Sequence, residues 1–431
     1  MAKKLTRSRR QRRPPDAEAG ADAMPISGDA SAGKVTAVSL PPHLVDCIPW
    51  YLSAVDSARL AAVCKSWSVI AARRLADPAP HLFAFRSTST HRRGDIITAV
   101  PAAGEFASSR HVAPAHPELR RVTRRTGCLG ATAGGRLVLA NTRRTVLFNP
   151  VTGTFRRIKK FPGKPLPHRV SPMPVVPLAG DSFFHAGRNK VGVWHAEDDT
   201  WTARHIDYAE SLRMAVLCGV GVFALDTEGY VFMIDLTTFY ATKVPVPSLL
   251  DKDHTALTGA VEKGYLVEAA GEVFFVWPLF TTSRVRAKHR DFDPELFVFS
   301  DDEDDDGEDD DYFFDDVTRL SGFDVYRLDI SGMRWVGVDR LGGDVALFVS
   351  RWSSFSVRAS EKGCVSNCVY FVCDEGAGNT WGAFSLGERS MLFEHDIGAG
   401  GSYKERLWFY PSLKEPGQED VGRRLDEIGY I

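Results

Sequence analysis

The sequence lacks any long hydrophobic run. Its longest apolar stretch, residues 214–225, is too short to cross a bilayer, which takes about 20 apolar residues. No apolar segment follows the basic residues at the start of the chain, so the sequence shows no secretory signal. We therefore expect an intracellular, soluble protein that resides in the nucleus, the cytoplasm or both.

The chain also has few cysteines and a small net charge. The chain has seven cysteines, an odd number, and disulfide frameworks belong to short secreted chains, so we expect reduced thiols. The net charge of −2 gives no bulk attraction to nucleic acid or to a membrane, and we expect neither as a partner. With 431 residues, of which 44% are hydrophobic, the chain is long enough for two or more folding units.

Motifs for catalysis and cofactor binding are missing as well. The sequence has no G-x-S-x-G, P-loop, H-E-x-x-H or kinase motif. Residues 219–224, "GVGVFA", imitate a dinucleotide fingerprint, but a turn and a strand follow where that motif needs a helix. We expect no catalytic residue and no cofactor.

Candidate metal ligands do not form a complete set. Cys364, Cys368 and Cys373 lack a second pair of ligands, and we interpret them as small buried residues of strands. His43 and Cys47 lie four residues apart, but again no second pair is obvious. The acidic run at residues 301–311 imitates a calcium loop, yet its last ligand position holds Phe313 instead of Glu, so we expect no metal site.

What the sequence does have is a helical segment near its start. Residues 1–34 carry seven Lys or Arg among the first thirteen, and little that can be buried. We expect a disordered basic tail there, which is either merely solvated or serves in nuclear targeting or nucleic-acid contact. In the next segment, apolar residues recur every four positions on one helical face: Leu40, Leu44, Ile48 and Leu52.

A second helix is predicted to begin at Asp56 as its N-cap and to carry Leu60, Val63 and Cys64. Trp67 and Ile70 extend the apolar face, and residues 76–80, "ADPAP", end the helices. Three short helices in fewer than forty residues cannot hide this much apolar surface from water. The segment should therefore be covered by the rest of the chain or by another protein.

From about residue 81 the pattern changes to short aromatic and β-branched runs separated by turns. The clearest unit, residues 134–158, reads as three strands with an "NPVTG" turn. Similar hairpins recur at 190–206, 229–247, 323–341 and 381–397. The early copies lie about 40–45 residues apart, which is typical of the four-stranded blades of a β-propeller.

This spacing predicts an all-β propeller of about six or seven blades over residues 81–412, followed by a C-terminal tail at 413–431. The doubled gap before residue 323 leaves room for a further blade near residues 271–280. The acidic run has ten carboxylates in eleven residues, and we expect a disordered insertion in a blade at about 299–316. It is either a plain solvated loop or a contact for a basic partner.

The segment "LPPHLVDCIPWYLSAVDSARLAAVCKSW" resembles the F-box motif, which implies a small all-α domain of three helices over residues 36–80. The resemblance implies binding to a Skp-type adaptor and, through it, to a cullin. It differs from the family in one place, because F-boxes often have a proline just after the position of Leu52. Here Pro49 comes earlier and should end or kink the first helix. The implied adaptor contacts are Leu40, Pro41, Leu44, Ile48, Leu52, Val63, Cys64 and Trp67.

The remainder of the chain is similar to plant F-box proteins that carry a C-terminal propeller of the KIB type. The similarity rests on "LFNPVTGTFRRI" and on residues 342–375, where "SFSV" precedes "NCVYF". A plant origin follows from this resemblance only. We interpret Trp194, Trp201 and Trp277 as blade core, with target recognition as the alternative.

These observations together predict a non-catalytic protein, the substrate-recognition subunit of an SCF-type E3 ubiquitin ligase. In this hypothesis the F-box holds the adaptor, and propeller loops hold an unknown target for degradation. The alternative, favoured by Pro49, is a propeller that binds proteins outside a ligase and carries a degenerate F-box.

Overall fold

The structure, a computed structural model, describes residues 54–76, 78–87, 92–98, 111–122, 126–141, 144–163, 173–206, 209–250, 261–287, 313–373, 380–397 and 403–412. The predicted basic tail, the predicted C-terminal tail and the acidic run at 301–311 lie outside these residues, as does the first predicted helix.

Among the residues that the structure describes, two helices precede the sheets. Helix α2 spans Ala54–Ala61 and helix α3 spans Lys65–Ala76. The predicted N-cap was wrong, because the helix begins two residues before Asp56, whose carboxylate instead pairs with Arg59 at 2.9 Å within the first turns. The same helix ends before Val63 and Cys64, which lie in the connection to α3. The predicted stop is confirmed: α3 ends where the "ADPAP" stretch begins.

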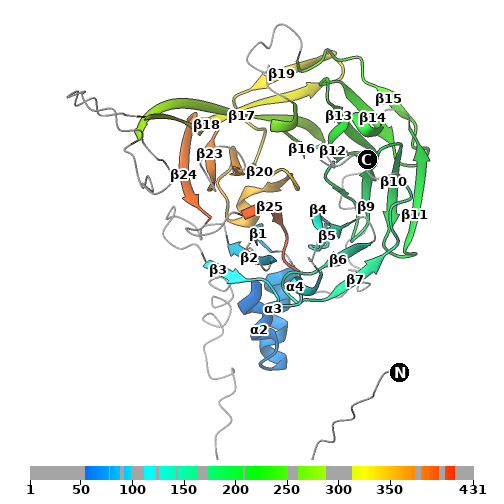
Figure 1. The fold of residues 1–431 in the computed structure, drawn as a ribbon, viewed down its shortest axis with the longest axis vertical. Helices are drawn as coiled ribbons and strands as arrows, with labels where there is room; N and C mark the ends of the chain where they lie inside the picture. Colours follow the sequence, from blue (N-terminus) through cyan, green and yellow to red (C-terminus); the bar gives the residue numbers. More distant parts are fainter. Residues whose placement is uncertain are drawn as a thin grey trace, which may run out of the picture.

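Six sheets of short strands form a ring, so that the chain folds as a six-bladed propeller (Figure 1). The first blade contains β25 (Tyr403–Phe409), β1 (His81–Ser87), β2 (Arg92–Thr98) and β3 (His111–Pro114). The second contains β4 (Gly127–Ala131), β5 (Leu137–Ala140), β6 (Thr145–Phe148) and β7 (Phe155–Ile158). The third contains β8 (Val176–Pro177), β9 (Phe183–Ala186), β10 (Lys190–His195) and β11 (Thr200–His205).

The last three blades follow in the same way. The fourth blade contains β12 (Leu212–Cys218), β13 (Gly221–Asp226), β14 (Val231–Asp235) and β15 (Ala241–Lys243). The fifth contains β16 (Tyr265–Ala269), β17 (Glu272–Ala287), β18 (Phe313–Asp329) and β19 (Arg334–Val338). The sixth has five strands: β21 (Phe355–Arg358), β20 (Val345–Val349), β22 (Cys368–Val372), β23 (Thr380–Ser385) and β24 (Ser390–Asp396). The short helices α4 (Leu119–Val122) and α5 (Ala359–Lys362) connect strands.

The core is divided among the six interfaces between neighbouring blades. Each of six buried apolar clusters draws its side chains from two adjacent sheets, and together the six clusters follow the whole ring. The first and second blades, for example, bury Phe83 and Leu137 in one cluster. No blade can bury both of its faces alone, so each blade depends on its two neighbours.

The ring closes where the two ends of the propeller pair. Strand β25 runs antiparallel to β1, with His81 opposite Phe409 and Leu82 opposite Trp408. The Trp408 side chain is fully buried, and its indole N–H donates a hydrogen bond to the Val349 carbonyl at 3.0 Å. The C-terminal strand thus completes the first blade and packs it against the last one.

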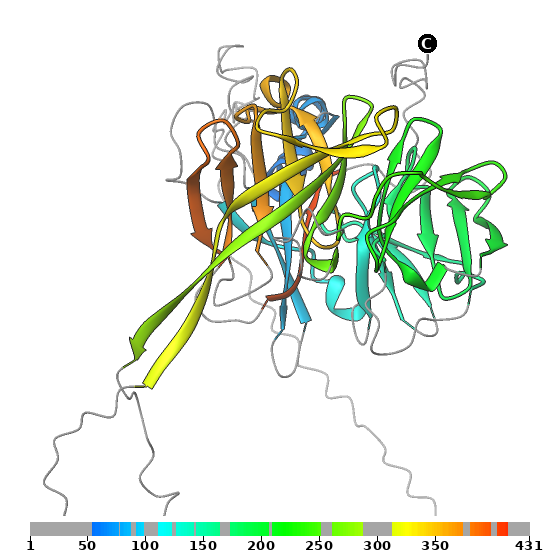
Figure 2. The ribbon, with the colours of Figure 1, turned by 90° about the horizontal axis from the view of Figure 1, so that it is seen from above.

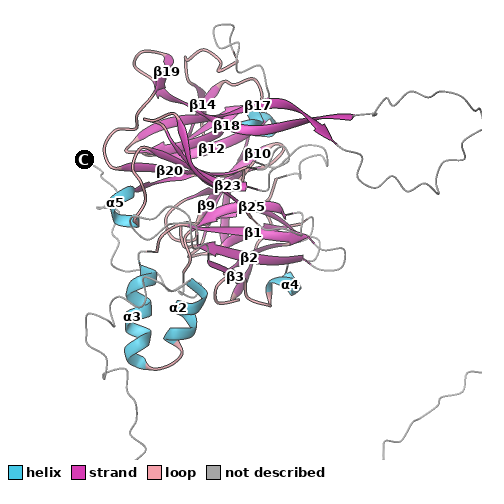
Figure 3. Ribbon diagram, turned by 90° about the vertical axis from the view of Figure 1, so that its left-hand side faces the viewer, coloured by secondary structure: helices cyan, strands magenta, loops and turns pink. Residues whose placement is uncertain are grey.

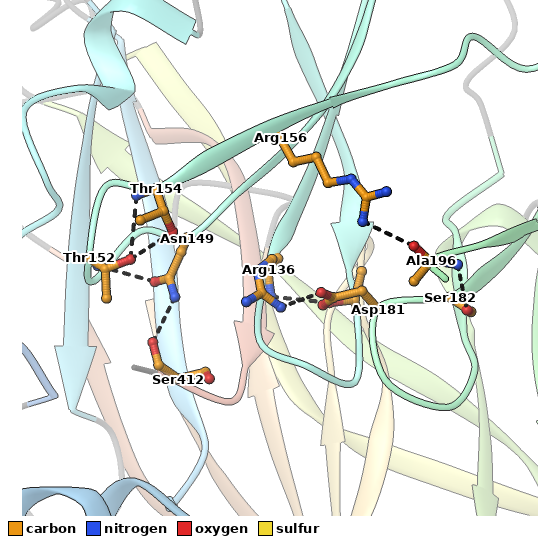
Figure 4. A network of polar contacts seen from close by, with 10 residues as sticks. Arg136, Asn149, Thr152, Thr154, Arg156, Asp181, Ser182, Ala196 and Ser412 are labelled. Carbon is orange, nitrogen blue, oxygen red and sulfur yellow. Dashed lines mark hydrogen bonds and ion pairs between the residues drawn. The ribbon is translucent and has the colours of Figure 1, made fainter. Parts of the chain in front are cut away.

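Polar contacts join the blades near the same closure (Figure 4). The amide nitrogen of Asn149 donates to the Ser412 carbonyl at 2.7 Å, just beyond β25. Arg136 and Asp181 form a buried ion pair between the second and third blades, and Thr132 donates to the same carboxylate at 2.9 Å. Because both charges are paired and hydrogen-bonded, their burial is tolerated.

The recurrent hairpins predicted from the sequence are confirmed as the two outer strands of five blades. The turn of each hairpin contains one residue with positive φ. It lies four positions after the residue that begins the turn, which is the last residue of the preceding strand or, in the second blade, Asn149. The positive-φ residues are Gly153, Asp199, Phe239, Met333 and Arg389. Asp235 shows why the turns start with a short polar residue, since its carboxylate accepts the backbone N–H groups of Thr237 and Thr238 and its pKa is lowered.

The predicted extra blade near residues 271–280 was wrong. Strand β17 there pairs with β18, so both belong to the blade that also contains the 323–341 hairpin. The doubled spacing reflects long strands: 16 residues in β17 and 17 in β18. Their distal halves form a two-stranded ribbon that stands out from the ring and leads to the acidic run (Figure 2). The predicted end of the disordered insertion, at about residue 316, was therefore wrong, because residues 313–316 pair with β17 as part of β18.

Removing the closing side chain should destabilise the whole ring. We expect Trp408→Ala to lower the free energy of unfolding by about 3–5 kcal/mol, because it leaves a large cavity in a fully buried site. Urea denaturation would measure this loss. The control, Tyr240→Ala, removes an aromatic ring that is 66% exposed and should change stability by less than about 0.5 kcal/mol. Equal losses in the two variants would contradict the closure argument.

The hairpin turns generate a paired prediction. Gly153 has φ +77° and leaves no room for a Cβ beside the His116 ring, so Gly153→Ala should destabilise the protein by more than about 1 kcal/mol.

Met333 occupies the equivalent position with φ +51° and is 55% exposed. Met333→Gly relieves left-handed strain of about 1 kcal/mol and should raise the melting temperature. A lowered melting temperature for Met333→Gly would argue against this equivalence.

Candidate functional site

The turn between α2 and α3 presents apolar side chains to solvent. Val63 is 68% exposed, Cys64 is exposed, and Trp67 is half-buried at the start of α3. The carbonyl of Cys64 accepts the Ser68 N–H at 2.9 Å, so Cys64 stands at the N-terminal end of α3. Val69, one turn later, is 56% exposed. Exposed apolar residues that cluster on one short segment are typical of a surface that another protein covers.

The structure therefore brings together three of the eight predicted adaptor contacts, which are Val63, Cys64 and Trp67. The other five lie outside the described residues: Leu40, Pro41, Leu44, Ile48 and Leu52. Pro49 also lies outside them, so its effect on the first helix stays a prediction.

The residues just before β1, next to the helical segment, are buried. Helix α3 ends at Ala76 and β1 begins at His81. Between them, Ala79 and Pro80 are buried. The Nδ1 atom of His81 lies 2.8 Å from the carbonyl oxygen of Ala79. The His81 ring also packs edge-on to Phe409 of the closing strand, with ring centroids 6.4 Å apart. The helices are thus attached directly to the first blade (Figure 3).

The helices and the β17–β18 ribbon lie at opposite ends of the ring (Figures 2 and 3). This follows from the strand directions, because the chain enters β1 at the end of the ring where β25 finishes. Strands β17 and β18 join at the other end. One end of the propeller therefore carries the helical segment, and the other carries the ribbon.

A cavity of about 280 Å³ lies at the ribbon end of the central channel. Its wall includes the first residues of the inner strands β8, β12 and β16, together with the turn between β20 and β21. Phe280 and Leu320, at the root of the ribbon, complete the wall. Three cationic residues, Arg213, Lys263 and Arg351, line this cavity, and Glu268 is the only carboxylate among its described lining residues.

The three tryptophans considered for recognition belong to the blades. Trp194 is fully buried, and its indole N–H donates to Asp199 at 3.2 Å. Trp277 is also buried. Trp201 is half-buried and donates to the Lys159 carbonyl at 2.7 Å, which ties two blades together. All three positions fit the interpretation as blade core.

The cysteines of the last blade are not exposed, and their thiols are not easily deprotonated. Cys368 and Cys373 are buried and Cys364 is half-buried. Burial raises the pKa of Cys364 to about 12 and that of Cys368 to about 11, which keeps both as thiols at neutral pH. Across the part of the chain that the structure describes, no three His, Cys, Asp or Glu side chains gather as a metal site. Nor is any described helix long and apolar enough to cross a membrane.

Sequence reasoning missed the cationic cavity. Arg213, Lys263 and Arg351 come from three different blades and are separated by 50 residues or more, so no local motif joins them. Only the closed ring brings them together. The exposed turn was found because its residues are adjacent in the sequence.

Comparisons with known proteins agree with this architecture. The KIB1-4 β-propeller family matches residues 106–399, which is more than half of the chain. An F-box protein of Arabidopsis thaliana is 51% identical over 55 residues, which cover 12% of this chain and 16% of that protein. The match thus spans about one sixth of the curated relative's length.

Similarities to solved structures are distant. A nidogen/laminin complex matches with 8% identity and a TM-score of 0.38, over 77% of this chain and 99% of that chain. The Cps50 (Swd1) β-propeller domain of Myceliophteria thermophila matches with 10% identity and a TM-score of 0.32, over 64% and 88% of the two chains. The family match is what assigns the chain: it belongs to the KIB1-4 β-propeller family and resembles the plant F-box proteins that carry such a propeller.

Proposed function

We propose that the protein is the substrate-recognition subunit of an SCF-type E3 ubiquitin ligase. The observation that carries this proposal is the exposed turn at Val63 and Cys64, which stands beside a propeller of the KIB1-4 type. In this function the α2–α3 segment docks on a Skp-type adaptor and, through it, on a cullin. The protein then works in the nucleus, the cytoplasm or both.

The mechanism is positional and needs no bond-making residue in this chain. The adaptor binds at the helical end of the ring, and the target binds at the ribbon end. In this proposal the attachment of the helices to the first blade, next to the buried residues 79–81, sets the distance between the two. A target held at a fixed distance from the charged conjugating enzyme presents its lysines at high effective concentration, which is how the subunit accelerates transfer.

A propeller that binds proteins outside a ligase is the second candidate. Pro49 favours it, since a proline inside the predicted first helix removes one backbone hydrogen bond and kinks or ends that helix. This candidate requires no adaptor, so adaptor binding separates the two functions.

A matched pair of valines tests adaptor docking. Val63 and Val220 are both 68% exposed, but Val220 lies in the β12–β13 turn of a distant blade. We expect Val63→Glu to reduce retention of a plant Skp-type adaptor at least tenfold, because a carboxylate would be buried in an apolar contact. Val220→Glu should retain the adaptor fully. The measurement is a pull-down with purified full-length proteins.

Trp67→Ala extends the same test to the start of α3. Loss of adaptor binding by both the Val63 and Trp67 variants, with melting temperatures unchanged, would support the ligase function. If the unaltered protein retains no adaptor, the ligase function is wrong and the free-standing propeller is the better account.

A further inference from the structure

The mouth of the central channel has the properties of an anion site. We propose that this cavity binds a phosphorylated serine or threonine side chain of the target protein; the inference deepens the proposed function and rests on it. The three cations that line the cavity are Arg213 on β12, Lys263 just before β16, and Arg351 in the β20–β21 turn.

Charge selects the ligand. The described lining holds three cationic residues and one carboxylate, Glu268. A phosphate monoester carries a charge of about −1.5 to −2 at neutral pH and three acceptor oxygens, so it can accept from several cations at once, which a single carboxylate does less well. Two of the three cations are arginines, whose planar guanidinium groups donate paired hydrogen bonds to phosphate oxygens.

Local contacts hold the two arginines, Arg213 and Arg351, in place before a ligand binds. Arg213 donates from Nη1 to the Leu212 carbonyl at 3.2 Å. The guanidinium carbon of Arg351 lies 5.7 Å from the Trp352 ring centroid, within cation–π range. The turn that carries Arg351 is itself fixed, because the Ser350 hydroxyl donates to the Ser353 carbonyl at 2.6 Å. Such preorganisation lowers the entropic cost of binding.

The setting of the cavity points to a side chain of a protein. The cavity has about 280 Å³, at the lower end of the range for ligand pockets, about 300–1,000 Å³, and this is room enough for a phosphorylated side chain. Half-buried Phe280 and Phe355 line it beside the cations, so that apolar neighbours of a phosphorylated residue find contacts. The residues that line the cavity also lie at the ribbon end, opposite the helices, where the proposed function places the target.

Immobilised peptide libraries test the inference. The probes are nine-residue peptides with random flanks and a fixed central phosphoserine, phosphothreonine, serine or glutamate. We expect the purified full-length protein to be retained at least tenfold better by the two phosphorylated libraries than by the serine or glutamate libraries. Retention should weaken as salt concentration rises, because the contact is ionic.

Two charge-matched double variants assign the binding to the cavity. Arg213→Gln with Arg351→Gln should lose at least tenfold in retention. Arg334→Gln with Arg340→Gln removes the same charge from exposed positions in and just after strand β19, outside the cavity lining, and should bind like the unaltered protein. Melting temperatures of both variants confirm that they are folded.

Three outcomes would overturn the inference: equal retention on all four libraries, equal retention on the phosphorylated and glutamate libraries, or full binding by the cavity variant. The same preparations are tested for adaptor retention. Adaptor binding without phosphopeptide binding leaves the ligase function standing and rejects the cavity site. Phosphopeptide binding without adaptor binding rejects the ligase function alone.

Discussion

The pairing of β25 with β1 is the contact on which the rest of the structure depends. It joins residues more than 300 positions apart and turns an open row of blades into a ring. In an open row the two terminal blades would each expose an apolar face and an unpaired strand edge. Closure buries the sixth interface, and Trp408 fills it. The entropic cost of joining such distant segments grows only slowly with their separation, so one well-packed strand is sufficient.

Closure also fixes the two surfaces that the proposed function uses. His81 begins the strand that pairs with β25, and its ring packs against Phe409 of that strand only when the ring of blades is closed. The cavity likewise needs the inner strands of several blades at once. In the proposed function the propeller is therefore a spacer, with the exposed α2–α3 turn at one end and the cationic cavity at the other.

Local features of this fold could be predicted from sequence, and distant ones could not. The outer hairpins were recognised because each is a contiguous segment with a polar turn, such as the turn that contains Gly153. The ribbon was mistaken for a blade because strand spacing does not show whether an interval contains a new sheet or a longer pair of strands. The pairing of β17 with β18 is a contact between segments separated by an insertion, which no local period reveals.

The same distinction holds for the sites. Val63, Cys64 and Trp67 lie within five residues, so a resemblance to a motif identifies them. Arg213, Lys263 and Arg351 share no pattern, and their meeting depends on blade number and on closure. The sequence indicated six or seven blades, and only the pairing of strands gives six.

Hydrogen exchange of the full-length protein, with and without a plant Skp-type adaptor, tests the central claim most directly: that the two ends of the ring have different partners. The account predicts slower exchange in residues 60–70 when the adaptor is present, and unchanged exchange around the cavity, at residues 263–266 and 350–356. Slower exchange at the cavity when the adaptor is present, or unchanged exchange in residues 60–70, would contradict it.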